Sequence, residues 1–174
     1  RCPHAATRPL ASVMSRGPDT IAAKWALVTG ASSGFGLEFA ALLAERRMNL
    51  VLVARRTDVL EQLARRLHGE HGVRVIVGGR DLSSAGSGTA LKQRVDAQGI
   101  VVEALVNNAG YGLYGDFVEQ PLSKTRNMLE LNVVAMTELT RVFAADMVPR
   151  RSGYILLVAS LLGFQAVPRY AAYA

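Results

Sequence analysis

The sequence predicts an α/β fold in which helices cover both faces of a parallel sheet, a doubly wound arrangement. Short apolar runs of strand length alternate along the chain with longer segments whose apolar residues recur at helical spacing. A glycine-rich turn joins the first apolar run to the first helical segment. Such alternation implies right-handed crossovers between parallel strands, and 174 residues suffice for one domain with a substantial core.

The first unit is the turn Thr29–Gly36, which follows the apolar run Trp25–Val28 and precedes a helical segment. At such a junction glycines let the backbone turn sharply, and the free N–H groups and dipole of the new helix face an anion. Gly30 would permit the bend, Gly34 the approach of a cofactor and Gly36 the close packing of helix on strand. The spacing Gly-x-x-x-Gly-x-Gly therefore indicates a phosphate site in this context, and elsewhere only a structural turn.

The next units repeat the pattern of strand and helix. A strand buried on both faces is expected at Asn49–Ala54, and Thr57 or Asp58 can cap the helix that follows. Four apolar residues of that helix recur at helical spacing: Val59, Leu60, Leu63 and Leu67. The third and fourth strands are expected at Val73–Val77 and Val101–Val106, with another helix between them.

A long helix is expected from about Ser123 to Met147. Its apolar stripe consists of Met128, Leu129, Leu131, Val134, Leu139 and Phe143. Pro149 and the Arg-Ser-Gly that follows would end the helix, and Tyr154–Ala159 would form a fifth strand.

Polar or glycine residues follow each of the five expected strands. The carboxyl ends of parallel strands meet at one edge of the sheet, and ligands bind there near the point where the strand order reverses. The sequence therefore brings the following residues to one edge: Gly30, Arg55, Asp81, Asn107–Gly110 and Ser160.

The composition argues against several other classes of protein. The net charge of +6 comes from scattered arginine pairs and not from a basic stripe with aromatics, so a solvated surface is favoured over a nucleic-acid site. Cys2 is the sole cysteine, which excludes an internal disulfide and a cysteine-based zinc site, and the histidines suggest no metal cluster. The apolar run Ile155–Phe164 is too short to span a membrane. We expect a soluble, cytoplasmic protein with no metal, nucleic-acid or membrane partner.

Residues 1–22 contain three prolines and no acid before Asp19, which indicates a flexible extension to a nucleotide-binding domain at 23–174. A transit peptide is the alternative, but the segment has no clear amphipathic period. The sequence begins at Arg1, so either Met14 is the natural start or the chain is a fragment.

A set of motifs resembles the short-chain dehydrogenase/reductase family in residue type, order and spacing: the turn Thr29–Gly36, Asp81, Asn107–Gly110, Asn132, Ser160 and Tyr173. Tyr173 follows Ser160 by thirteen residues, the separation typical of the family's catalytic pair. The resemblance extends from about residue 24 to the end of the chain. It implies a Rossmann-like sheet of about five strands in the order 3-2-1-4-5, and an oxidoreductase that transfers a hydride between NADP(H) and a small carbonyl or alcohol substrate.

The resemblance also implies the catalytic residues. Hydride transfer to or from a carbonyl carbon leaves a proton to be moved, so the site needs a general acid/base near the reacting oxygen. Tyr173 would play that part, and Ser160 would hydrogen-bond the same oxygen and stabilise its developing charge. Asn132 would hold a water in the proton relay, although alone it would be interpreted as an amide on a helix face.

The implied cofactor contacts lie in the loops. Asn108, Ala109 and Gly110 look like the loop along the adenosine side of the cofactor, and Asp81 like the acceptor for the adenine amino group. Without the resemblance, the loop would be a simple turn and Asp81 a helix cap with Ser83. The full set of expected contacts is Gly30, Ser32, Ser33, Gly34, Phe35, Gly36, Arg55, Asp81, Leu82, Asn108, Ala109 and Gly110.

The end of the second strand favours NADP over NAD. NAD-binding proteins place an acid about twenty residues after the glycine turn, where it binds the ribose 2′-hydroxyl. This sequence has Arg55 and Arg56 there, and a guanidinium suits the 2′-phosphate of NADP. Ser32 would add a hydrogen bond. Asp58 is the competing acid, but it lies late and suits the first turn of a helix.

The family pattern breaks after Tyr173. The family has a lysine four residues after its tyrosine, but this chain ends at Ala174. The family also continues with further strands and a substrate-covering loop, without which the fifth strand would be an open edge. We therefore expect a truncated product or part of a longer, homo-oligomeric enzyme, with the substrate unspecified. The alternative is a non-catalytic NADP-binding or interaction module; a methyltransferase on a similar sheet would leave Ser160 and Tyr173 unexplained.

Overall fold

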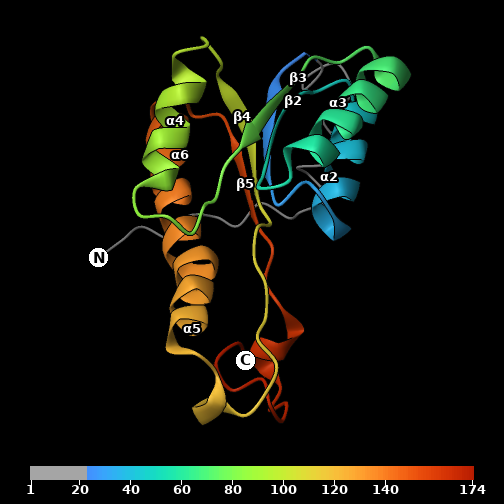
Figure 1. The fold of residues 1–174 in the computed structure, drawn as a ribbon. Helices are drawn as coiled ribbons and strands as arrows, with labels where there is room; N and C mark the ends of the chain where they lie inside the picture. The colour runs from blue at the N-terminus through green and yellow to red at the C-terminus, as the bar shows by residue number, and fades with distance from the viewer. Residues whose placement is uncertain (1–22) are drawn as a thin grey trace.

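A computed structural model describes residues 23–174 as a five-stranded parallel sheet with helices on both faces (Figure 1). The spatial order of the strands is β3-β2-β1-β4-β5. Their bounds are β1 Trp25–Thr29, β2 Asn49–Ala54, β3 Val75–Gly79, β4 Val102–Asn107 and β5 Tyr154–Leu157. The predicted fold class and strand order are confirmed. The extension expected at residues 1–22 lies outside the described residues.

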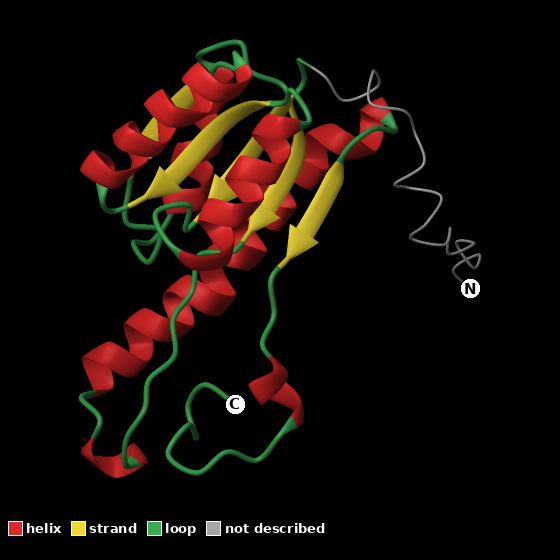
Figure 2. Ribbon diagram, turned by 90° about the vertical axis from the view of Figure 1, so that its right-hand side faces the viewer, coloured by secondary structure: helices red, strands yellow, loops and turns green. Residues whose placement is uncertain are grey.

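The helices form two layers. Helices α2 (Gly34–Glu45) and α3 (Thr57–His71) cover one face of the sheet, and α4 (Ser87–Asp96) and α6 (Met136–Arg150) cover the other (Figure 1). Helix α5 (Leu122–Leu129) continues into α6 through a π turn at Glu130–Ala135. Figure 2 shows α5 extending past the edge of the sheet to which the strand arrows point.

Each face of the sheet has its own buried cluster, because successive strand residues point to opposite sides. On β2, Leu50 and Leu52 belong to the cluster that packs with α2 and α3, whereas Val51 and Val53 belong to the cluster that packs with α4 and α6. This double burial explains why the strands read as continuous apolar runs instead of alternating ones.

The predicted long helix is present, and it ends directly before the expected Arg-Ser-Gly segment, three residues beyond Met147. Pro149 lies inside the last turn of α6, so it does not stop the helix, which ends at Arg150; the C-cap residue Arg151 has a left-handed backbone with φ +51°. The Ser152 N–H donates to the Met147 carbonyl (3.2 Å), a bond that closes a left-handed helix end and does not require proline.

Two residues of the expected apolar stripe do not belong to the core. Leu129 and Val134 are 45% and 50% exposed, whereas Met128, Leu139 and Phe143 are buried. The reason is that α5 and the π turn lie past the sheet edge, where the described residues cover only part of the helix surface (Figure 2).

Three smaller expectations were also wrong. Helix α3 begins at Thr57 itself, with Arg56 at the N-cap and no side-chain cap bond, so neither Thr57 nor Asp58 is the cap. Strand β3 begins at Val75, where it first pairs with β2, and β5 ends at Leu157. Strand boundaries depend on where the neighbouring strand begins and ends, which the local sequence does not encode.

Strand β5 is an edge of the sheet in the described part of the chain, as expected. Its residues Tyr154, Leu156 and Leu157 are exposed over a third or more of their surface. Within residues 23–174, no helix combines the length and the apolar character that a membrane span requires.

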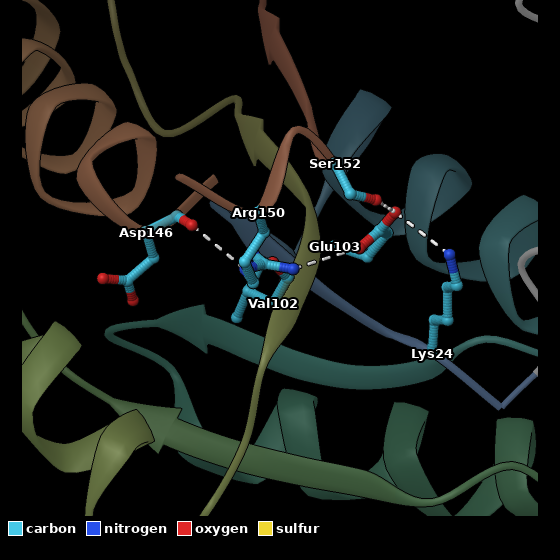
Figure 3. A network of polar contacts seen from close by, with 6 residues as sticks. All are labelled: Lys24, Val102, Glu103, Asp146, Arg150 and Ser152. Atoms are coloured by element: carbon cyan, nitrogen blue, oxygen red, sulfur yellow. Dashed lines mark hydrogen bonds and ion pairs between the residues drawn. The ribbon is translucent and has the colours of Figure 1, made fainter. Parts of the chain in front are cut away.

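A buried carboxylate ties three elements together near the edge of the sheet where the strands begin (Figure 3). Glu103 of β4 is only 6% exposed. It accepts hydrogen bonds from Lys24 Nζ (3.1 Å), from the Ser152 hydroxyl and from Arg150 Nη1 (3.4 Å). Arg150 also donates to the Val102 carbonyl (3.0 Å). The network therefore joins the residue before β1, the start of β4 and the end of α6.

The groups around Glu103 control its ionisation. Burial by itself would raise the pKa of this carboxyl group, but hydrogen bonds from Ser152 and Lys24 and the charges of Lys24 and Arg150 outweigh it and lower the pKa. A lowered folded-state pKa adds stability that is present above the ordinary value of 4.5 and is lost as the pH falls through the lowered value.

We predict that Glu103→Gln lowers the free energy of unfolding by about 2 kcal/mol at neutral pH, because its cationic partners lose a buried negative charge. Urea denaturation of both proteins measures the difference, which should shrink as the pH falls below 4.5. Glu61→Gln, at an exposed position of α3, is the control and should leave stability unchanged. Equal stability of Glu103→Gln and wild type at neutral pH would contradict the prediction.

Candidate functional site

The carboxyl ends of all five strands lie at one edge of the sheet, and the loops after β4 and β5 extend beyond it (Figure 2). The strand order reverses between β1 and β4, which are neighbours in the sheet although two other strands lie between them in the chain. In open parallel sheets this is the position at which ligands bind. The loops after β1 and β4 therefore form the centre of the candidate site.

The glycine turn after β1 is closely packed on one side and open on another. Gly30 has a left-handed backbone (φ +66°), and a Cβ there would lie 2.8 Å from Asn108 Nδ2. A Cβ on Gly36 would collide with the Gly30 carbonyl. Gly34 is also left-handed (φ +55°), but a Cβ there would meet no atom within 4 Å. Two of the three glycines are thus required for loop packing, and Gly34 adjoins open space.

The packing depends on Thr29, the last residue of β1 and only 1% exposed. Its hydroxyl oxygen accepts from the backbone N–H groups of Asn108 (2.9 Å) and Ala109 (3.0 Å), and the hydroxyl donates to the Val106 carbonyl (3.3 Å). The Asn108 side-chain amide donates in return to the carbonyls of Thr29 (3.1 Å) and Gly30 (3.4 Å). These bonds lock the loop after β4 against the glycine turn.

Helix α2 begins in this turn with its first N–H groups uncapped by a side chain. Ser33 occupies the N-cap position in an extended conformation and makes no side-chain cap bond. Ser33, Gly34 and Phe35 are exposed. The first N–H groups of a helix need acceptors and carry the positive end of the helix dipole, so this terminus suits an anion.

An arginine after β2 reaches the glycine turn, but it is Arg56 and not Arg55. Arg56 Nη2 donates to the Ser32 carbonyl (3.1 Å) and to the Ser32 hydroxyl (3.2 Å). Arg55 is exposed and its positive charge acts on Asp81. Hydrogen bonds from Ser83, and to a lesser degree the Arg55 charge, hold the pKa of Asp81 below its ordinary value. Asp81 is therefore a carboxylate at neutral pH.

The loop after β3 is connected to α5 and to the loop after β4. Asp81 Oδ1 accepts from the Ser83 N–H (3.0 Å) and hydroxyl (2.7 Å), but this turn precedes α4 instead of capping it. The Asn127 amide donates to the Ser83 hydroxyl (2.7 Å) and accepts from the Tyr111 hydroxyl (2.9 Å). Leu82 is buried, so it anchors this loop in the core.

Asn132 holds the backbone of the loop after β4. Its Oδ1 accepts from the Tyr111 N–H (3.1 Å) and its Nδ2 donates to the Tyr111 carbonyl (2.8 Å). It lies in the π turn between α5 and α6, a type of turn that recurs at functional sites. A Cβ on Gly110 would lie 3.0 Å from the Oδ1 atom of Asn132. Asn132 is thus more than an amide on a helix face, because its side chain binds one residue through both polar groups.

Ser160 lies beyond the end of β5, at the N-cap of the 3₁₀ turn Leu161–Phe164. Its hydroxyl oxygen accepts from the Leu162 N–H (3.2 Å). Among residues 23–174 the hydroxyl proton has no acceptor, so the group can donate to a ligand.

Tyr173 packs against the loop after β4. Its ring faces Gly112, where an added Cβ would lie 3.2 Å from the ring, and its centroid is 6.2 Å from that of Tyr170. In the described part of the chain, no hydrogen bond joins Tyr173 to Ser160. The structure therefore brings Tyr173 to the loop that Asn132 holds, without a direct hydrogen bond between the expected catalytic pair.

Three residues that organise the site had no role assigned from the sequence: Thr29, which was included only as the first residue of the glycine turn, Tyr111 and Asn127. Thr29 could have been recognised, because it directly precedes the first glycine of the turn and has a hydroxyl group at the end of an apolar strand. Tyr111 and Asn127 carry no such signal, since their partners come from other elements.

Comparison with known proteins gives consistent relatives. A family model described as short chain dehydrogenase matches residues 24–174. A very-long-chain 3-oxoacyl-CoA reductase of Phaeosphaeria nodorum is 34% identical over 155 residues, which cover 86% of this chain and 45% of that protein. The human dehydrogenase/reductase SDR family member 7 is 35% identical over 144 residues, 81% of this chain and 42% of that protein. The chain thus spans less than half the length of these two relatives.

Solved structures agree with the fold. A short-chain dehydrogenase from Sphingobium yanoikuyae in complex with NADPH superposes with a TM-score of 0.81 at 35% identity, covering 86% of this chain and 59% of that one. L-sorbose reductase from Gluconobacter frateurii, complexed with NADPH and L-sorbose, superposes with a TM-score of 0.82 at 34% identity, covering 88% and 58%. The motifs, the strand order and these matches lead to one conclusion: the chain belongs to the short-chain dehydrogenase family.

Proposed function

We propose that this chain carries the NADP(H)-binding region and the catalytic serine and tyrosine of an oxidoreductase that interconverts a carbonyl compound and an alcohol. The observation that carries the proposal is the uncapped N-terminus of α2 beside a loop that Thr29 locks in place, at the reversal of strand order. NADPH complexes among the similar solved structures support it.

The cradle suits a dinucleotide on physical grounds. The pyrophosphate would lie on the N–H groups of Ser32–Gly36, next to Gly34, whose missing side chain leaves space. The adenosine side would run along Asn108–Gly110, with the Asp81 carboxylate accepting from the adenine amino group and Leu82 beside it. When bound, the nicotinamide supplies or accepts the hydride.

The two arginines after β2 support NADP as the preferred cofactor. Arg55 is exposed, so its guanidinium can pair with a 2′-phosphate, although its charge also acts on the Asp81 carboxylate. Arg56 already bonds Ser32, which places a second guanidinium at the same turn. An acid at this position would bind a ribose hydroxyl and repel the phosphate, and neither residue is an acid.

The chemistry proposed for the catalytic residues is proton transfer. In carbonyl reduction the Tyr173 hydroxyl gives its proton to the oxygen that becomes the alcohol, and the Ser160 hydroxyl donates a hydrogen bond to the same oxygen. Each polar group of the Asn132 amide makes one hydrogen bond with Tyr111, so the side chain retains one N–H and one oxygen lone pair with which to hold a water of the proton relay.

We predict that Tyr173→Phe lowers kcat for NADPH-dependent carbonyl reduction by about 10²- to 10⁴-fold in the full-length polypeptide, because the general acid is lost. The assay follows NADPH absorbance with a panel of aldehydes and ketones. Tyr154→Phe, on the edge strand β5, is the control and should keep full activity. A wild type that binds NADPH but reduces no carbonyl would favour the non-catalytic module instead.

We predict that Arg55→Asp lowers the ratio of kcat/KM with NADPH to that with NADH by about 10- to 100-fold, since a charge-assisted bond becomes a repulsion. Arg56→Ala should lower the same ratio less, because Arg56 also holds Ser32. Arg66→Asp, exposed on α3, changes the net charge equally and should leave the ratio unaltered. An unchanged ratio in Arg55→Asp would remove Arg55 from cofactor selection.

A further inference from the structure

We infer that Arg169 is a positioning residue that holds Tyr173 in place. It does so through a set of contacts, here called the clamp, formed by Arg169, Asp116, Tyr114 and Gly115. The inference rests on the proposed function, in which Tyr173 is the general acid. The clamp joins two segments that are far apart in the chain, the loop after β4 and the segment after β5, and both lie beyond the sheet edge in Figure 2.

The backbone of Arg169 requires support. Its φ is +69°, a left-handed conformation that residues with a side chain adopt only at a cost in free energy. Three contacts with the opposite loop hold it there. Arg169 Nε pairs with Asp116 Oδ1 (3.3 Å), its guanidinium carbon lies 5.0 Å from the centre of the Tyr114 ring, and its carbonyl accepts from the Gly115 N–H (2.9 Å).

The path from Arg169 to Tyr173 is short and hydrogen-bonded. The N–H groups of Tyr173 (2.8 Å) and Ala174 (2.9 Å) both donate to the carbonyl of Tyr170, the residue directly after Arg169. The Tyr170 ring is adjacent to the rings of Tyr114 and Tyr173, with centroid distances of 5.2 and 6.2 Å. A shift of Arg169 would therefore be transmitted to the Tyr173 ring.

The opposite loop is itself fixed to the helices. Asn132 binds both backbone groups of Tyr111, and Gly112 lies against the Tyr173 ring. Gln120 Nε2 donates to the Tyr114 carbonyl (2.9 Å), which supports the part of the loop that forms the clamp. The clamp thus places Tyr173 relative to the π turn that carries Asn132, which the end of β5 alone does not do.

The energetics indicate a positioning role and not a stabilising one. The side chains of Arg169 and Asp116 are 51% and 56% exposed, and exposed ion pairs add little to stability. A displacement of about 1 Å at a catalytic group, in contrast, costs a large factor in rate. The effect of the clamp should therefore appear in kcat.

The test compares Arg169→Gly and Asp116→Asn with wild type in the full-length enzyme. Glycine adopts the left-handed backbone without strain, so Arg169→Gly removes the side-chain contacts and keeps the chain path available. We expect kcat to fall about tenfold in both variants while the KM for NADPH stays within about twofold. Amide exchange of Tyr173 and Ala174, read by mass spectrometry without any substrate, should become faster.

Two further variants make the result specific. Arg151→Gly changes the same residue type at another left-handed position, at the end of α6 near the opposite edge of the sheet, and should change neither kcat nor the exchange. A double variant that combines Asp116→Arg with Arg169→Asp reverses the ion pair. Its kcat should be higher than that of Asp116→Arg or Arg169→Asp alone, because the ion pair is restored and Asp tolerates the left-handed region. A double variant no faster than the single ones would count against the ion pair as the link.

The outcomes separate the clamp from the proposed function. If Tyr173→Phe keeps its activity, the proposed function fails, and the clamp then fails with it as a device for catalysis. If Tyr173→Phe is inactive but Arg169→Gly retains kcat, the inference is overturned even where amide exchange is faster, since the clamp then holds the segment without positioning the acid. Unchanged exchange in Arg169→Gly overturns it regardless of activity.

Discussion

The site depends on the hydrogen bonds between the Thr29 hydroxyl and the backbone of Asn108 and Ala109. They join the loops after β1 and β4, the two strands between which the order of the sheet reverses. Because Thr29 is buried, leaving its hydroxyl group unpaired would cost free energy. The hydrogen bonds that the hydroxyl makes therefore fix the position of one loop relative to the other. This arrangement requires glycine at positions 30 and 36, because a Cβ on Gly30 or Gly36 would collide with the loop after β4 or with the turn itself.

The loop after β4 connects the two halves of the site. At its start, Asn108 bonds the glycine turn, and the next part of the loop is held by Asn132 on the π turn. Further along, Gly112 lies against Tyr173 and the clamp with Arg169 begins. One continuous segment thus relates the proposed cofactor cradle to the proposed acid, although neither bonds the other directly.

Buried or partly buried carboxylates stabilise the other parts of the fold. Glu138 of α6 accepts from the Gly88 N–H (3.2 Å) and the Thr89 N–H (3.0 Å) at the start of α4, a cap supplied by a neighbouring helix. The Thr89 side-chain hydrogen bond is the main cause of the lowered pKa of Glu138. Glu103 joins elements where the strands begin, while the site lies where they end. The Glu103 network and the proposed chemistry therefore lie at opposite edges of the sheet, whereas the Glu138 cap lies at the start of α4, which follows the carboxyl end of β3.

The sequence by itself determined the alternation of parallel strands and helices, the two buried faces of strands such as β2, and the sheet edge at which the glycine turn and the polar loops gather. These follow from local periodicity and from the handedness of parallel crossovers, which act on every chain of this pattern. The strand order followed only from the resemblance of its motifs to the short-chain dehydrogenase/reductase family. Only the tertiary structure decided that Arg56 and not Arg55 bonds Ser32, and that Arg169 meets Asp116. Those contacts join residues from separate elements, and their geometry arises only when the packed elements set the distances between side chains that no local pattern relates.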